Sequence, residues 1–311
     1  MPIPDGYVLR APTPDDRPAV AAVLIADELD DVGQSTLGEA FVEAEWTRAG
    51  FDPAVDAWVV ADADGSIVGY SQVRLDSPEL AQSWGVVHPE HRGRGIGSAL
   101  IGRIEDHARE LADPRPSRLR HATNANDRGI SAILAGRGFE PVRHFWHMVI
   151  ELDGAPDPGP PLDGIEVGGV AGDDDVRAVQ RVLAAAFAED WDYHPDDFDR
   201  WAAEQATDPG EIGTLWVLAK EDGAAVGALT ASNGPERGWV DELGVMASHR
   251  RRGVGAGMLR RAFAAFAEAG QREVAVSVDS ANPTGATGLY ERVGMRVVKG
   301  WDQWERRLDP A

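Results

Sequence analysis

Two loops of the chain share the pattern Arg-x-x-Gly-x-Gly, whose residue types suit the binding of an anion. The copies begin at Arg92 and Arg250, 158 residues apart, and each lies between an apolar segment and an amphipathic segment. Glycines allow close approach of the backbone to a ligand and positive φ angles. Free N–H groups at a helix start, with the helix dipole behind them, attract negative charge. The pattern predicts two phosphate-binding loops; the alternative is a pair of tight turns.

Two other phosphate-binding patterns do not fit these loops. The chain has no Gly-Lys-Ser/Thr sequence in them, which excludes a nucleoside-triphosphate P-loop. A dinucleotide-binding fold would place Gly-x-Gly-x-x-Gly near the start of its unit. Here the first glycine loop begins only at Arg92, after many other predicted elements.

The repeat extends well beyond the glycine loops and predicts two domains. Matching pairs are Asp5-Gly6 with Asp163-Gly164, Asp64-Gly65 with Asp222-Gly223, and Ala125-Asn126 with Ala281-Asn282. Two copies at this period indicate two domains rather than a solenoid. Four prolines within residues 156–161 favour an extended connector. We therefore predict domains at 1–152 and 163–311, joined by a linker at 153–162.

Each half predicts the same order of strands and helices. A short strand and a helix come first, followed by a hairpin with an Asp-Gly turn, the central strand, the glycine loop and a helix. A further strand, helix and strand complete the second half. The ranges are 7–10, 19–29, 57–61, 67–75 and 98–111 in the first half, and 165–170, 176–187, 215–219, 225–231, 256–269, 274–278, 284–292 and 296–299 in the second. This order predicts an α/β (α+β) fold, twice over.

Composition narrows the classes of function. The net charge of −22 makes nucleic-acid binding unfavourable, because the backbone of nucleic acids is also anionic. The same charge favours a cationic substrate such as an amine, or only serves solubility. The chain has no Cys, which excludes disulfides, thiolate metal sites and a Cys nucleophile, and we predict no metal site. Residues 1–10 do not resemble a signal peptide and no apolar run could span a membrane, so we expect a cytoplasmic protein.

Both glycine loops and a later motif resemble those of the GNAT acetyltransferase superfamily. The first loop follows Val87-His88-Pro89, as is usual in that superfamily, whereas the second has Ala247 in place of the proline. The later motif is Asn282-Pro283, then Ala286, Leu289-Tyr290 and Gly294-Met295. The resemblance covers nearly the whole chain, and the tandem layout is similar to that of the mycothiol synthases.

The resemblance implies the fold of each domain and its cofactor. Each domain would be a mixed, mostly antiparallel sheet flanked by helices, with a bulged central strand that splays from its neighbour to admit acetyl-CoA. Strand-end backbone would hold the pantetheine arm, and the loop N–H groups would hold the pyrophosphate. The residues so assigned are Leu243, Gly244, Val245, Met246, Arg250, Arg251, Arg252, Gly253, Val254, Gly255, Ala256 and Asn282 in the second half, and Val86, Val87, Arg92, Gly93, Arg94, Gly95, Ile96, Gly97 and Ser98 in the first.

Catalysis would need a base for the attacking amine and an acid for the departing thiolate. The resemblance assigns the acid to Tyr290, whereas the aligned residue of the first half is Leu134, which has no proton to donate. Asp241 and Glu242 precede the second loop and are both candidate bases, although either could be a solvated acid. Strand alternation places them on opposite faces, and a bulge could change that. The first half has Gln82-Ser83-Trp84 in the corresponding segment, so we expect catalysis in the C-terminal domain only.

Several alternatives stay open from the sequence. The expected reaction is direct N-acetylation of a primary amine on a small molecule, and a mycothiol-synthase-like acetylation of a Cys-glucosaminyl amine is a narrower version. A non-catalytic CoA-binding sensor or scaffold belongs to another class. Acids and aromatics at 189–197 could wall a cationic acceptor or form a solvated turn. Tyr290 could be a core aromatic and Asn282 a helix cap. The chain could be a monomer or a homodimer.

Overall fold

The structure is a computed structural model that describes residues 2–33, 35, 37–48, 50–111, 116–154, 157–188, 190–193, 197–205, 215–234, 237–282 and 284–308. It contains two compact units. Unit 1 comprises Met1–Phe145 together with Lys299–Ala311, and unit 2 comprises Trp146–Val298.

Unit 1 is built from a mostly antiparallel sheet and five helices. Its strands are β1 (Val8–Arg10), β2 (Ala57–Ala61), β3 (Ile67–Ser77), β4 (Leu80–Val87) and β5 (Arg118–Asn124), and its helices are α1 (Arg17–Val32), α2 (Glu39–Trp46), α3 (Pro53–Asp56), α4 (Ile96–Ala108) and α5 (Arg128–Gly136). Short 3-10 turns lie at η1 (Pro14–Asp16) and η2 (Pro89–His91). The strand order runs from β1 to β5, and β4 pairs with β5 in parallel.

Helices cover both faces of the sheet in unit 1, which explains why some strands are apolar throughout. Every residue of β2 is buried, as expected of a strand covered on both sides. One face packs Ile96 and Leu100 of α4 into a core with Leu119. The other face packs Val20 and Leu24 of α1.

Unit 2 repeats this arrangement. Its strands are β7 (Ile165–Gly169), β8 (Val217–Glu221), β9 (Ala224–Asn233), β10 (Gly238–Val245) and β11 (Glu273–Asp279), and its helices are α6 (Gly172–Phe187), α7 (Phe198–Gln205), α8 (Val254–Glu268) and α9 (Ala286–Arg292), with a 3-10 turn η3 (Ala247–His249). Asp222 and Gly223, both at positive φ, form the β8–β9 turn that the Asp-Gly pattern predicts.

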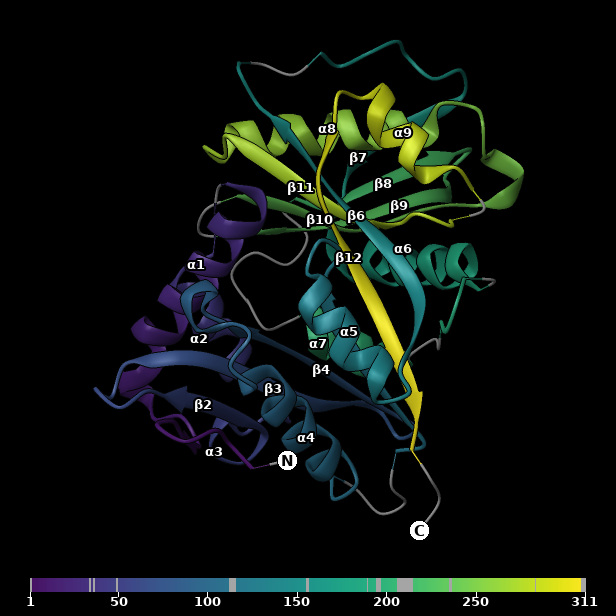
Figure 1. Ribbon diagram of the computed structural model, residues 1–311. Coiled ribbons are helices and arrows are strands. Elements are labelled where there is room, and N and C mark those ends of the chain that lie inside the picture. The colour runs from purple at the N-terminus through teal and green to yellow at the C-terminus, as the bar shows by residue number, and fades with distance from the viewer. Residues whose placement is uncertain are drawn as a thin grey trace. The chain divides into compact units, whose positions relative to one another are not determined.

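Two cores hold the helices of unit 2 against opposite faces of its sheet (Figure 1). The predicted buried stripe of α8 is confirmed, since Met258, Phe263 and Phe266 are almost fully inaccessible to solvent. On the other face α6 packs Val179 and Leu183 against the sheet, next to Trp201 of α7. The predicted fold class, two tandem mixed sheets flanked by helices, is confirmed.

The compact units divide the chain at different positions from the predicted linker at 153–162. Strand β6 (Glu140–Glu151) begins in unit 1 and ends in unit 2, where it lies beside β11. Strand β12 (Arg296–Arg307) begins in unit 2, and its Trp301–Arg307 segment pairs antiparallel with β5 of unit 1. Each unit thus completes its sheet with a strand from the other half of the sequence. A short-range sequence pattern contains no information about such an exchange.

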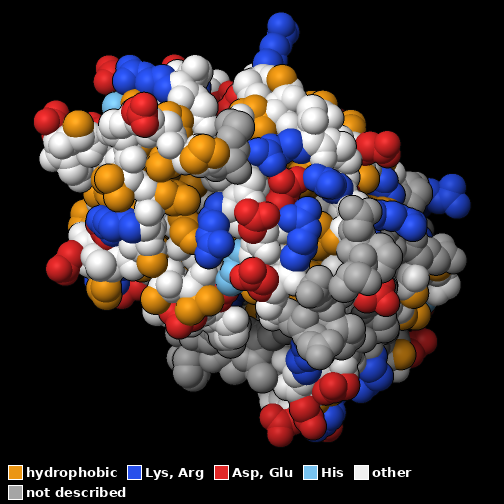
Figure 2. Space-filling view, turned by 60° about the horizontal axis from the view of Figure 1, so that its bottom comes forward, with side chains coloured by type: hydrophobic (Ala, Val, Ile, Leu, Met, Phe, Trp, Pro, Cys, Tyr) orange, Lys and Arg blue, Asp and Glu red, His pale blue; other side chains and the backbone are white. Residues whose placement is uncertain are grey.

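Charged side chains of both signs are interspersed over the face shown in Figure 2. Among the residues that the structure describes, no helix is long and apolar enough to cross a membrane.

The pairing of β12 with β5 can be tested through a buried ion pair. Glu305 Oε2 accepts from Arg120 at 2.6 Å, and the Arg120 side chain is only 7% exposed. Glu305→Ala should lower the free energy of unfolding by about 2 kcal/mol, because it removes a carboxylate that is bonded to a buried guanidinium. Chemical denaturation measures this loss.

Glu151→Ala is the matched control. Glu151 pairs with Arg296 at 2.8 Å, but both side chains are more than half exposed, so its loss should cost less than about 0.5 kcal/mol. Equal effects of the two substitutions would contradict the burial of Arg120 between β5 and β12.

Candidate functional site

The central strand of unit 2 contains a bulge that ends its pairing with β11. The parallel ladder joins Gly238–Val240 of β10 to Val274–Val276 of β11. Both strands continue beyond it, β10 to Val245 and β11 to Asp279. The register of β10 on β9 shifts between Val240 and Glu242, which leaves Asp241 as the extra residue. The ladder to β11 therefore ends at the bulge, while β10 stays paired with β9 as far as Val245.

The bulge brings Asp241 and Glu242 to the same face of the sheet. Glu242 lies opposite Thr230 on β9. Asp241 Oδ1 accepts a hydrogen bond from Ser232 Oγ at 3.0 Å. Thr230 and Ser232 are two residues apart on one strand, so their side chains share a face. The opposite faces expected from simple alternation are wrong here, because the bulge adds one residue to β10.

The two carboxylates have different surroundings. Glu242 is half-buried, and burial raises its pKa, with the nearby charge of Asp241 adding to the rise and a hydrogen bond from the Trp201 indole opposing it. Asp241 keeps an exposed surface, yet the protein around it limits its hydration and raises its pKa to about 6. The hydrogen bond from Ser232 opposes this rise. Asp241 is thus the accessible member of the pair.

Tyr290 lies on α9 and is 5% exposed, in the core beneath α8. Burial raises the pKa of its phenol well above the usual value. The hydroxyl therefore remains protonated at neutral pH, and in this core it is a weaker acid than a solvated phenol. Leu134, the aligned residue on α5 of unit 1, is fully buried and offers no such group.

Both predicted phosphate loops have the same backbone shape. Gly253 and Gly95 cap the N-termini of α8 and α4 with φ values of 84° and 90°. Two residues earlier, Gly93 and Arg251 also have positive φ, at 75° and 63°. Each loop thus presents the N-terminal end of a long helix, where N–H groups lack intrahelical partners.

The first arginine of each loop fastens the loop to its own unit. Arg250 donates to the carbonyl oxygens of Val245 and Ala186, both at 3.2 Å. Arg92 donates likewise to Val87 O at 3.2 Å, but its other nitrogens bind the carboxylates of Asp27 and Asp30. These hydrogen bonds fix the start of each loop against the strand and helix that precede it.

A second brace holds the loop of unit 2. Glu221, at the end of β8, accepts from Arg252 at 2.6 Å and contacts His249 Nε2 at 2.8 Å. These partners, Arg252 foremost, lower the pKa of Glu221 to about 2. In unit 1 the hydroxyl of Tyr7 plays the corresponding part, at 3.0 Å from both Arg94 and His91.

Comparison with known proteins decides the family. The model of the acetyltransferase (GNAT) family matches the chain twice, over residues 24–139 and 176–295. The chain belongs to the acetyltransferase (GNAT) family. It is an N-acetyltransferase with two GNAT domains, and the resemblance inferred from the two loops is confirmed. The family generally takes its acetyl group from acetyl-CoA.

Among relatives, a mycothiol acetyltransferase of Geodermatophilus obscurus is 32% identical over 297 residues, covering 89% of each protein. Another, of Cellulomonas flavigena, is 28% identical and covers 76% of this chain and 71% of that protein. A GCN5-related N-acetyltransferase from Sphaerobacter thermophilus has a TM-score of 0.88 at 29% identity, covering 100% of this chain and 98% of the other. A tandem GNAT protein from the clavulanic acid biosynthesis pathway shares the fold, with a TM-score of 0.71 at 18% identity.

Other predicted site residues of this GNAT chain have local roles. Asn282 Oδ1 accepts from the backbone N–H of Thr284 at 2.9 Å, so its oxygen shapes the turn before α9. In the acidic and aromatic segment 189–197, Glu189 and residues 194–196 lie outside the described residues. Asp190 is described, and burial raises its pKa while the charge of Arg250 opposes the rise.

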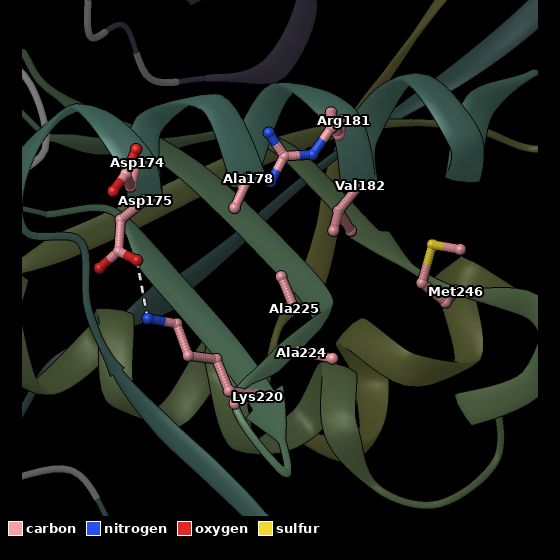
Figure 3. A pocket seen from close by; sticks show the side chains of 10 residues that line it. Asp174, Asp175, Ala178, Arg181, Val182, Lys220, Ala224, Ala225 and Met246 are labelled. Carbon is pink, nitrogen blue, oxygen red and sulfur yellow. Dashed lines mark hydrogen bonds and ion pairs between the residues drawn. The ribbon is translucent and has the colours of Figure 1, made fainter.

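A pocket on unit 2 does not coincide with the predicted catalytic residues (Figure 3). It lies between α6 and the β8–β9 hairpin, where Lys220 Nζ pairs with Asp175 at 2.7 Å. Met246 is the one residue of its lining that the resemblance assigns to the cofactor. The lining residues are Asp174, Asp175, Ala178, Arg181, Val182, Lys220, Gly223, Ala224, Ala225 and Met246.

The structure adds four residues that the sequence did not single out, namely Trp201, Ser232, Glu221 and Asp27. Trp201 and Ser232 contact the carboxylate pair, and Glu221 and Asp27 hold the loop arginines. Of these four residues, only Asp27 could have been noticed from the sequence, because the repeat aligns this acidic residue with Ala185. The others lie outside any motif.

The backbone strain at Arg251 can be tested by replacing it with Gly and with Ala. Both substitutions remove the same exposed charge, but only Gly adopts positive φ without a steric cost, as Gly93 does in unit 1. Arg251→Gly should be more stable than Arg251→Ala by about 1 kcal/mol. Thermal and chemical unfolding would compare the two. Equal stability would mean that the loop relaxes away from the left-handed conformation.

Proposed function

We propose that unit 2 transfers an acetyl group from acetyl-CoA to a primary amine of a small molecule by direct attack on the thioester. The observation that carries this proposal is the bulge of β10. It places two carboxylates, both with a raised pKa, beside the open end of the β10–β11 ladder. The same strand leads directly into the glycine loop at the start of α8.

The residues that would hold acetyl-CoA follow from the order along the chain. The backbone of Leu243–Met246, beyond the end of the ladder, would bind the pantetheine arm. The loop from Arg250 to Ala256 would bind the pyrophosphate through its N–H groups and the dipole of α8. Exposed Arg251 and Arg252 add positive charge at this helix end, in an otherwise strongly acidic chain.

Asp241 and Glu242 would accept the proton that the amine must lose. An acceptor amine is protonated at neutral pH and becomes a nucleophile only after deprotonation. A group with a pKa of about 6, as Asp241 has, is mostly ionised at neutral pH. It can therefore attract the ammonium group and take up its proton, directly or through water.

Tyr290 would supply a proton to the leaving group. As the amine nitrogen bonds to the acetyl carbon, the carbon–sulfur bond breaks and the electron pair passes to the CoA sulfur. The phenol of Tyr290 would donate its proton to that sulfur as negative charge gathers there, although burial opposes the release of this proton. The phenolate is then reprotonated from solvent, and no covalent intermediate with the enzyme forms.

Unit 1 would have no turnover of its own. The segment of β4 that corresponds to Asp241 and Glu242 is Gln82-Ser83-Trp84, with no carboxylate. Leu134 replaces the proposed acid and is buried in the core. We therefore propose a catalytic C-terminal domain and a non-catalytic N-terminal domain.

The relatives named mycothiol acetyltransferases favour one narrower acceptor, a Cys-glucosaminyl amine. An assay with this acceptor beside a panel of simpler primary amines decides between them. Acetyl-CoA binding without turnover of any amine would instead support a CoA-binding sensor or scaffold.

Tyr290→Phe tests the proposed acid. It removes one hydroxyl and keeps the aromatic ring, so it should lower kcat by about 100-fold while the Kd of acetyl-CoA stays within about twofold. Steady-state kinetics with a turned-over amine and calorimetric titration measure the two effects. An unchanged kcat would remove Tyr290 from the mechanism.

Tyr70→Phe in unit 1 is the matched control. Tyr70 is also fully buried, and its hydroxyl bonds to Trp46 at 2.8 Å and Gln72 at 2.6 Å. Its loss should lower stability by about 1 kcal/mol and leave kcat unchanged. A fall in kcat equal to that of Tyr290→Phe would indicate a general effect of losing a buried hydroxyl.

A further inference from the structure

We propose that Asp241 acts as the base and that Ser232 positions its carboxylate. Glu242, which is held by Trp201, has only a supporting role. This inference rests on the proposed function of unit 2. The bulge presents both carboxylates on one face, but their hydrogen-bond partners come from different elements. Ser232 lies on β9, and Trp201 lies on α7.

Accessibility separates the two carboxylates. Asp241 and Ser232 are both exposed, so their hydrogen bond lies where an acceptor can arrive. Glu242 is half-buried beneath α7 and bound by the Trp201 indole, whose own side chain is 9% exposed. A base must come within hydrogen-bonding reach of the amine, directly or through one water. Asp241 meets this requirement more readily than Glu242.

The hydrogen bond from Ser232 also fixes the direction of the carboxylate. Oδ1 of Asp241 is occupied by the hydroxyl, which leaves Oδ2 to face the acceptor. A donor that favours the ionised form lowers the pKa of a carboxylate. Ser232 therefore keeps Asp241 ionised at a lower pH than burial alone would allow.

Charged and polar groups from several elements surround Asp241. Glu242 is its neighbour on β10 and destabilises a second negative charge. Nearer the start of β10, the ring centroids of Trp239 and His147 of β6 are 5.1 Å apart, and Arg237, just before β10, pairs with Glu273 of β11 at 2.9 Å. Ser232 on β9 is the hydrogen-bond donor to Asp241, and Trp201 of α7 donates to Glu242 instead.

The test is the pH profile of kcat/KM for the wild type, Ser232→Ala and Ser232→Thr in the full chain. Loss of the hydroxyl should raise the pKa of the acid limb by about half a unit and lower kcat several-fold. Ser232→Thr keeps a hydroxyl and should retain the wild-type limb. Ser66→Ala, in the exposed β2–β3 turn, should leave the profile unchanged.

If the pKa of the acid limb of the kcat/KM profile is the same in Ser232→Ala as in the wild type, this inference is overturned. A serine with only a structural role would change kcat without changing that pKa. Asp241→Asn separates this failure from failure of the proposed function. If Asp241→Asn abolishes turnover while Ser232→Ala has no effect on the limb, only the positioning role is wrong. If Asp241→Asn keeps full turnover, Asp241 is not the base.

A separate observation concerns unit 1, where we infer that the acidic end of α1 closes the cleft that would otherwise receive acetyl-CoA. The β4–β5 ladder ends at the pair Trp84 and Ala122, although β4 continues to Val87 and β5 to Asn124. The parallel ladder of unit 1 thus also ends before its central strands do, which leaves an opening between them, although β4 has no bulge at this point.

Asp27 of α1 bridges the two sides of this opening. Its Oδ1 accepts from Arg92, in the loop after β4, at 2.7 Å. Its Oδ2 accepts from Asn124 Nδ2, at the end of β5, at 3.2 Å. Asp27 is 8% exposed, so these bonds lie inside the unit. A pantetheine arm that entered between β4 and β5 would have to break them.

Neighbouring acids strengthen the closure. Asp30 accepts from Arg92 at 2.6 Å, and Glu28 binds both Lys299 and Ser35. The repeat aligns Asp27, Glu28 and Asp30 with Ala185, Ala186 and Ala188 in unit 2. There α6 offers Arg250 a backbone carbonyl, that of Ala186, and the charge of Asp190 lies nearby. The carboxylates near the first loop also oppose the negative phosphates of CoA.

Calorimetric titration of the full chain with acetyl-CoA tests this closure. We expect one equivalent to bind. Gly253→Val, at a positive-φ loop position of unit 2, should abolish binding. Gly95→Val, the same change 158 residues earlier in unit 1, should leave one equivalent bound. Circular dichroism would check that both variants fold.

Charge reversals provide a second matched pair that disturbs the backbone less. Arg252→Glu should weaken binding at least tenfold, and Arg94→Glu should leave it unchanged. Two equivalents in the wild type, or weaker binding in Arg94→Glu, would overturn the closure of unit 1. Absence of any acetyl-CoA binding would instead contradict the proposed function of unit 2.

Discussion

The candidate site depends on one irregularity, the extra residue that Asp241 inserts into β10. An undisturbed strand would continue its ladder with β11 and point successive side chains to opposite faces. The bulge ends the ladder with β11 and the alternation of side chains at the same place. It opens the gap that acetyl-CoA would need and brings Asp241 and Glu242 to one face beside that gap. The remaining parts of unit 2 hold this geometry in place: α6 and α7 cover the carboxylate face, and α8 packs beneath the strands.

The sequence predicted the fold well because duplication provides an internal check. Hairpins with Asp-Gly turns, the apolar stripe of α8 and the two glycine loops each appear twice, so a pattern in one half supports its interpretation in the other. Prediction was weaker where side chains from distant elements meet. Whether Asp241 and Glu242 share a face depends on a shift of register, which alternation alone cannot reveal. Trp201 and Ser232 reach the site through tertiary packing and have no motif around them.

The two units illustrate how similar loops can acquire different surroundings. Arg92 and Arg250 make the same hydrogen bond to the strand before them. Their remaining nitrogens differ, because α1 offers carboxylates where α6 offers a backbone carbonyl. Different residues on a neighbouring helix therefore give two loops of the same shape different surroundings. The loop sequence alone would assign both copies the same role.

The exchange of β6 and β12 has a consequence for the history of the chain. After a gene duplication, a copy that loses its chemistry is ordinarily free to be deleted. Here the last strand of each half ends in the other unit, so deleting the first half would remove a strand from the second sheet. If the N-terminal half has no active site, as proposed, selection on the fold would still retain it as the source of a strand of the second sheet.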